Sequence, residues 1–126
     1  MIILCSLKDV KKYARGTIYR TSIGGRYSMD AYKGIACLYP SWPMVMGHKN
    51  HTVSDESYCE QYEALMQQRW PAVEAWLKGL RTDTDITLLC YCPEFENGEH
   101  KFCHRMLIAK IIEVCRPDLK RVIVRH

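Results

Sequence analysis

The sequence predicts an α/β fold, with a mainly parallel sheet and flanking helices, in a single domain over residues 1–126. Residues 86–92, ITLLCYC, form an apolar run of strand length, as expected for a strand covered on both faces. A helical pattern and a last apolar run at 121–125 follow, which predicts a strand, helix and strand with a parallel crossover. With 126 residues and 48% hydrophobic composition, the chain can bury one core.

The N-terminal part predicts two further strands. MIILCSL indicates a buried strand near 2–6, and TIYRTSI, rich in β-branched and aromatic residues, indicates a second near 17–23. Between them, residues 8–16 predict a brief helix that closes at Gly16. Parallel pairing needs a crossover of roughly a dozen residues, which this connection barely supplies. If the two strands were antiparallel neighbours, the loop after residue 23 would leave the opposite edge of the sheet.

The middle of the chain predicts a structured excursion and two helices. Residues 27–52 carry glycines, prolines and aromatic residues, so this segment is expected to pack rather than to serve as a flexible linker. Ser54 offers an N-cap for the first helix, and Trp70 and Pro71 start the second with proline in its first turn.

The last helix is amphipathic and ends at Pro117. Its predicted buried face holds Leu107, Ile108, Ile111, Ile112 and Cys115. Arg105, Lys110, Glu113 and Arg116 are expected off that face.

Net charge and cysteine content indicate which ligands and which cellular compartment to expect. The net charge of +4 and the pI near 8.7 favour anionic ligands, without the basic excess of a protein that coats nucleic acid. The seven cysteines are odd in number and irregular in spacing, which favours reduced thiols. The chain lacks a signal-sequence pattern and a run of about eighteen apolar residues, so we expect a cytoplasmic protein that does not enter a membrane.

The densest group of reactive side chains is CYCPEFENGEHKFCHR, Cys90 to Arg105. Its loop leaves the carboxyl end of a predicted strand and enters a helix, which is where ligands bind in open α/β sheets. Arg105, in the first turn, adds a planar cation suited to phosphate or carboxylate. Gly24, Gly25 and Arg26 also follow a strand, so a parallel sheet would bring the two loops together as an anion site. The alternative is a solvated Arg105 and glycines that merely turn the chain.

The cysteines of this stretch allow several interpretations. Cys90 and Cys92 share a strand face about 6.6 Å apart. Zinc is disfavoured, because paired CxxC motifs are absent and adjacent Cys103 and His104 diverge around a helix. The phosphatase loop of cysteine, five residues and arginine is also absent. Cys103, beside His104 and Arg105 at a helix start, fits a reactive thiol, whereas the alternative is that all three cysteines pack as small apolar residues.

LLCYC, a loop and FCHRMLIA together resemble the signature of the family called domain of unknown function 488. Three further segments resemble the family's shorter members in the same order: a strand that ends in SIGG (Ser22 to Gly25), then YKGIACLYPSW, then the helix with Tyr58 and Tyr62. The family occurs in bacteria, archaea and phages. The resemblance implies a Rossmann-like domain and carries over to Cys103, His104 and Arg105. Cys90 or Cys92 is the implied partner at the strand end.

Three functions are open. The first is an enzyme that acts on a nucleotide, nucleoside or sugar-phosphate, in which Cys103 and His104 are catalytic. Binding would fall to Arg105, Ser22, Gly24, Gly25, Arg26 and Cys92. The second is a nucleic-acid- or nucleotide-binding module that uses the basic C-terminal end, and the third is a zinc-stabilised domain. We expect an anionic small molecule or nucleotide as the partner, nucleic acid as the alternative partner, and neither cofactor nor metal.

Overall fold

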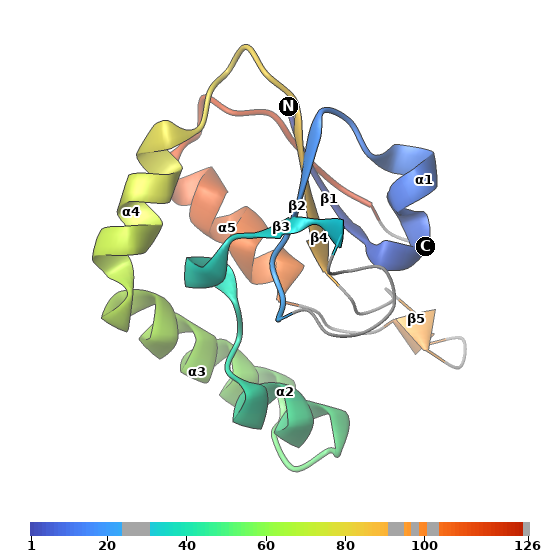
Figure 1. Cartoon of the computed structure of the whole chain (residues 1–126). Coiled ribbons are helices and arrows are strands. Elements are labelled where there is room, and N and C mark those ends of the chain that lie inside the picture. The colour runs from blue at the N-terminus through green and yellow to red at the C-terminus, as the bar shows by residue number, and fades with distance from the viewer. Residues whose placement is uncertain (24–30, 91–94, 97–98, 101–103, 125–126) are drawn as a thin grey trace.

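A computed structural model describes residues 1–23, 31–90, 95–96, 99–100 and 104–124 (Figure 1). Its main sheet has five strands in the order β3-β2-β4-β1-β7, and each neighbouring pair is parallel. The predicted α/β, Rossmann-like fold is therefore confirmed. These strands are β1 (Ile2–Ser6), β2 (Thr17–Arg20), β3 (Lys33–Gly34), β4 (Ile86–Cys90) and β7 (Arg121–Ile123). A small antiparallel pair consists of β5 (Phe95–Glu96) and β6 (Glu99–His100).

Helices cover both faces of the sheet (Figure 1). The single turn of α1 (Val10–Tyr13) lies on one face, and a group of longer helices lies on the other. The longer helices are α2 (Trp42–Lys49), α3 (Asp55–Gln68), α4 (Trp70–Gly79) and α5 (Arg105–Cys115). In β1, Ile2 and Leu4 belong to the core under the longer helices, whereas Ile3 and Cys5 belong to the core under α1. This alternation is the period of two that a strand imposes, and it explains why the whole run is apolar.

The short connection between β1 and β2 passes over the strand that separates them. Both strands pair in parallel with β4, so β1 and β2 are not neighbours. A 3₁₀ turn (Leu7–Asp9) and α1 form most of the connection, which then reverses at Gly16 with a φ of 65°. A Cβ at Gly16 would lie 1.7 Å from the carbonyl oxygen of Asp85, so the chain runs against the backbone that leads into β4.

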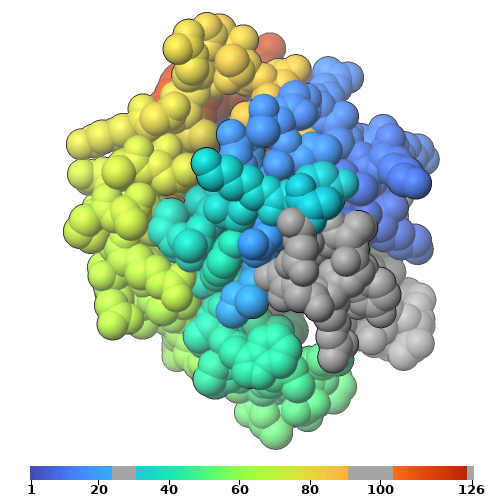
Figure 2. Space-filling view, viewed as in Figure 1, coloured from blue at the N-terminus to red at the C-terminus, as the bar shows by residue number. Residues whose placement is uncertain are grey.

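The excursion after residue 30 packs, as predicted, with Leu38 and Met44 in the main core, and it contains elements that the sequence did not predict. It supplies the edge strand β3, a 3₁₀ turn (Ala36–Leu38) and α2, whose first turn is capped by Ser41 Oγ, 3.4 Å from the amide of Met44. Figure 2 shows segment 31–40, in cyan, crossing the surface between the blue N-terminal part and the yellow-green helices.

The predicted start signals of α3 and α4 are confirmed. Ser54 Oγ accepts a hydrogen bond of 3.1 Å from the amide of Ser57, and Pro71 lies in the first turn of α4. Strand ends were predicted too long, because β2 ends at Arg20 and β7 at Ile123. β4 ends at Cys90, and residues 91–92 of its predicted span lie outside the described residues. Within the described chain, no helix has both the length and the apolar character that a membrane crossing requires.

Candidate functional site

The carboxyl ends of three parallel strands meet the start of α5. Buried polar side chains gather there: Ser6 at the end of β1, Thr21 just after β2, and His104 and Arg105 at the start of α5, each at most 3% exposed. The thiol of Cys90, at the end of β4, is fully buried among them. Because parallel strands end at one edge of the sheet, this convergence follows from the topology, and we call these five residues the edge cluster.

Arg105 is buried against the central strand. Its Nη1 donates to Cys90 Sγ at 2.9 Å, and only 1% of the residue is exposed. The prediction that Arg105 lies off the buried face of its helix was therefore wrong. The buried residues of α5 are Arg105, Ile108, Ala109 and Ile112, whereas Cys115, predicted on that face, is exposed. Compared with the prediction, the buried face of α5 is turned so that Arg105, in its first turn, points at the end of β4. A buried guanidinium needs polar neighbours of this kind.

His104 is held by the neighbouring strand end. Its Nε2 lies 3.0 Å from the carbonyl oxygen of Thr21 and 3.2 Å from Thr21 Oγ1, which itself donates to the carbonyl of Leu89 at 3.0 Å. Since a carbonyl only accepts, Nε2 carries the hydrogen in the neutral ring. Burial lowers the pKa of His104 to about 4. The charge of Arg105 also lowers this pKa, whereas the hydrogen bond to Thr21 raises it. The imidazole is therefore neutral at pH 7.

A tyrosine supports the histidine ring from the side of α3. The rings of Tyr62 and His104 lie 5.9 Å apart at 55°, and Tyr62 stacks in turn with Tyr58 at 6.5 Å. The Tyr62 hydroxyl donates to the carbonyl of Leu38 at 2.7 Å. This bond fixes the tyrosine in the core, so the position of the His104 ring depends on α3 as well as on β2.

The end of β1 adds groups that sequence reasoning missed. Ser6 pairs in register with Cys90, so their side chains share one face of the sheet. Ser6 Oγ donates to Asp9 Oδ2 at 3.1 Å. Cys5 faces the α1 side of the sheet. Burial, together with the neighbouring Cys90 and Asp9, raises the pKa of Cys5 to about 12, although the charge of Arg105 acts to lower it. For Ser6 a signal was available, because it is the first polar residue after the apolar run of β1, whereas Thr21 follows the polar Arg20 and gives no such signal.

A family comparison covers this site. The model described as "Active DUF488-N3 subclade" matches residues 6–115. The chain belongs to the DUF488 family. The matched span contains the whole edge cluster, from Ser6 to Arg105. Neither the curated proteins nor the solved structures give a match to the chain. Family membership confirms the resemblance read from the CHR segment.

The other predicted site residues are placed only in part. Cys92, Cys103, Gly24, Gly25 and Arg26 lie outside the described residues. Ser22 is half-buried beyond the end of β2, where its carbonyl accepts a bond of 3.1 Å from Arg20 Nη1. Since β2 is parallel to β4, the chain after Ser22 leaves the same edge of the sheet as Cys90. The short connection between β1 and β2 therefore does not make these strands antiparallel neighbours, which was the arrangement that would have sent the loop after residue 23 to the opposite edge.

The described part of the chain offers no group of three or more side chains of the metal-binding types. The cysteines described as free thiols are Cys5, Cys37, Cys59, Cys90 and Cys115. Cys92 and Cys103 lie outside that part, so the expectation of a metal-free protein stays a prediction.

Proposed function

We propose that this DUF488 protein is an enzyme that acts on a nucleotide, nucleoside or sugar-phosphate at the carboxyl edge of its sheet. The observation that carries the proposal is the buried guanidinium of Arg105, 2.9 Å from Cys90 Sγ at the end of the central strand. In open α/β folds this edge, next to a helix start, is the usual ligand site. The description of the matched subclade as active favours an enzyme over a purely binding module.

Charge supports an anionic group in the ligand. The start of α5 adds the positive end of the helix dipole to the charge of Arg105. A cation in a low-dielectric site attracts an anion far more strongly than one in water. The hydroxyls of Ser6 and Thr21 lie at the same edge, and such groups orient a polar ligand. A phosphate or a phosphate-like charge is the group that best fits this environment.

His104 fits the role of proton-transfer residue. A neutral imidazole can accept a proton, and its ring is oriented by Thr21 and Tyr62. Cys103, its neighbour, remains the proposed nucleophile. Cys90 lies against Arg105, and a thiol beside a cation is a second candidate for that role.

Ligand-induced thermal stabilisation tests the binding step. Inorganic phosphate, AMP and ribose 5-phosphate are added to the parent chain, and we expect at least one to raise the Tm, because it binds only the folded state. Arg105→Lys should weaken this response, since an ammonium cannot form paired bonds. Arg116→Lys is the matched control, because Arg116 caps the opposite end of α5 and bonds to the carbonyls of Leu77 and Leu80. Equal responses of the two variants would contradict the proposal.

Turnover tests the catalytic step. The stabilising ligand is incubated with the chain, and the products are followed by phosphorus and proton NMR. His104→Gln keeps a donor toward Thr21 but cannot accept a proton as imidazole does, so we expect the stabilisation to persist while turnover falls by about 100-fold or more. Full turnover by His104→Gln would exclude His104 as the proton-transfer group.

A further inference from the structure

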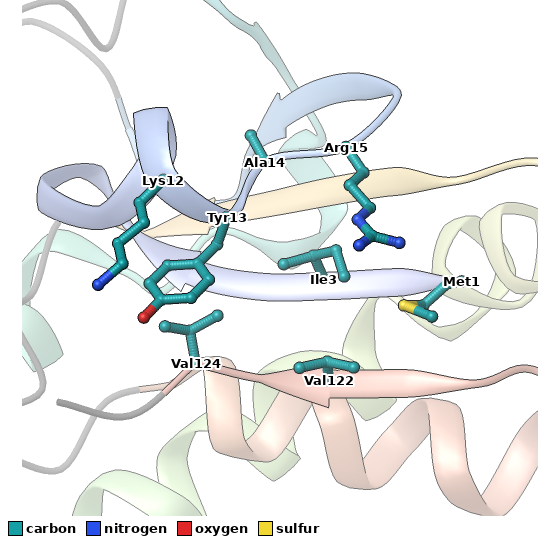
Figure 3. A pocket seen from close by; sticks show the side chains of 8 residues that line it. All are labelled: Met1, Ile3, Lys12, Tyr13, Ala14, Arg15, Val122 and Val124. Carbon is teal, nitrogen blue, oxygen red and sulfur yellow. The ribbon is translucent and has the colours of Figure 1, made fainter.

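A shallow groove lies on the face of the sheet that α1 covers only in part (Figure 3). Its volume is about 320 Å³, and its floor is formed by Ile3 of β1 with Val122 and Val124 at the C-terminal strand. Ile3 and Val122 pair in register, so both side chains rise from the same face. Val122 is 42% exposed, although it belongs to a strand. The groove is therefore apolar at its base and open to solvent.

Cations stand along the rim of this groove. Figure 3 shows Lys12 above the Val124 end, and Arg15 above Ile3 toward the Met1 end. Both are exposed, and in the part of the chain that the structure describes neither takes part in an ion pair. Lys8 and Lys11, on the same short connection, are exposed as well. The groove thus carries positive charge that is not neutralised by the described residues around it.

The backbone that presents these cations is fixed. Thr87 Oγ1, in β4, accepts from the amide of Arg15 at 2.8 Å and donates to the carbonyl of the same residue at 2.9 Å. The next residue, Gly16, makes the tight reversal against Asp85. The backbone of Arg15 is therefore held in place beside β4, so ligand binding need not order it, which lowers the entropy cost of binding.

An aromatic ring completes the groove. Tyr13 is half-buried between Lys12 and Val124, with Lys12 Nζ 5.2 Å from its ring centroid (Figure 3). An apolar floor, an aromatic wall and cations on the rim are the features with which proteins bind unpaired bases and their phosphates. A double helix keeps its base faces stacked inside, so it does not match an apolar floor.

We propose that this groove binds single-stranded nucleic acid, with phosphates against Lys12 and Arg15 and a base against Tyr13 and the valines. The size of the groove suits about one nucleotide unit of a longer strand, since it lies at the low end of small-ligand pockets. The proposal does not depend on the proposed enzymatic function. Cys90 lies on the other face of the sheet, since it shares the side of Leu88 in the core under the longer helices, and Arg105 of α5 bonds to it there.

Fluorescence anisotropy with labelled dT12 and rU12 tests the proposal. The parent chain should bind at least one of them, and the two oligonucleotides distinguish DNA from RNA. The double variant Lys12→Gln with Arg15→Gln should bind at least about tenfold more weakly. In a plot of log affinity against log salt concentration, the slope should become less steep by about 1.4, because each of the two lost phosphate contacts contributes roughly 0.7 for a single strand. Tyr13→Leu keeps the apolar packing but removes the stacking face, and should weaken binding by about fivefold or more.

The control removes two exposed lysines elsewhere, Lys49→Gln with Lys110→Gln, and so changes the net charge by the same amount. It should keep the parent slope. Equal losses in the two double variants would show that only net charge acts and would overturn the groove as the site. Binding of polyglutamate in place of both oligonucleotides would assign the groove to an acidic polypeptide instead. A dimer in sedimentation velocity that Val122→Glu dissociates, without oligonucleotide binding, would assign it to a second copy of the chain.

Discussion

His104 and Arg105 are adjacent in the sequence, yet different strands hold them. His104 bonds to Thr21 beyond β2, and Arg105 bonds to Cys90 at the end of β4. Neighbouring helical residues point about 100° apart, so one helix start reaches two strand ends. That divergence disfavours a shared metal ion, and it is also what allows the pair to occupy one edge of the sheet.

Protonation of His104 should make folding stability depend on pH. The folded pKa of about 4 lies below the ordinary histidine value of 6.5, so the unfolded chain binds the proton more readily. Stability from this group is complete above pH 6.5 and is lost as the pH falls toward 4. We expect a loss of about 2 kcal/mol between pH 7.5 and pH 5, measured by urea unfolding. His104→Gln should remove this part of the pH dependence, whereas His51→Gln, which changes an exposed histidine, should keep it.

The thiol of Cys5 should be inert in the folded protein. It has no exposed surface, and its pKa of about 12 leaves almost no thiolate at pH 8. Iodoacetamide at pH 8 should modify the exposed Cys115 within minutes and leave Cys5 unmodified, as read by peptide mass spectrometry. The same reaction in 8 M urea is the positive control for Cys5. Modification of Cys5 at the rate of Cys115 under native conditions would contradict its burial.

At the scale of elements, the connection between β1 and β2 decides the arrangement of the sheet. It is short, and it crosses β4 to reach the next strand position. Two features hold it against β4: the paired hydrogen bonds of Thr87 to Arg15, and the reversal at Gly16. Both the edge cluster and the groove depend on this segment, since it orders the strands and presents Arg15.

Gly16→Ala should therefore destabilise the fold strongly. A side chain is disfavoured at a φ of 65°, and its Cβ would meet the Asp85 carbonyl at 1.7 Å. We expect the free energy of unfolding to fall by about 3 kcal/mol or more, measured in urea. Gly79→Ala is the matched control, because nothing lies within 4 Å of its Cβ position at the end of α4. It should be neutral or stabilising by up to about 1 kcal/mol, and equal effects of the two variants would be contrary to this structure.

At the scale of the whole molecule, the sheet separates two regions of different chemistry. The face under α2 to α5 leads to the edge cluster, and the face under α1 carries the basic groove. Effects of distant sites without shared partners usually add. The two proposed binding events should therefore be separable by mutation.

We expect Arg105→Lys to weaken thermal stabilisation by phosphate ligands while leaving oligonucleotide affinity within about twofold of the parent. The Lys12 and Arg15 double variant should show the reverse. Both quantities are measured on each purified variant, after circular dichroism has confirmed its fold. Loss of both responses in either variant would mean that the two ligands share one site.

Much of the fold follows from local patterns in the sequence. The apolar runs at 2–6 and 86–90, the N-cap at Ser54 and the proline in the first turn of α4 are signals carried by a few neighbouring residues, and each matched an element. The residues at the ends of strands were harder to predict, because pairing partners rather than propensity decide where a strand ends. The two-residue strand β3 gives no periodic signal at all.

The sequence by itself determined the class of fold, the membership of the DUF488 family and the position of His104 and Arg105 at a strand-to-helix junction, because these rest on short-range patterns and on motif identity. The tertiary structure alone decided that β4 lies between β1 and β2, that Arg105 is buried, and that Ser6 and Thr21 join the site. The physical reason is that parallel strands bring together residues that are far apart in the sequence, and Thr21 and His104, for example, are 83 positions apart. The periodicity of apolar residues along α5 does not show which residues of its first turn the strand ends will cover, and for this reason it did not predict the burial of Arg105.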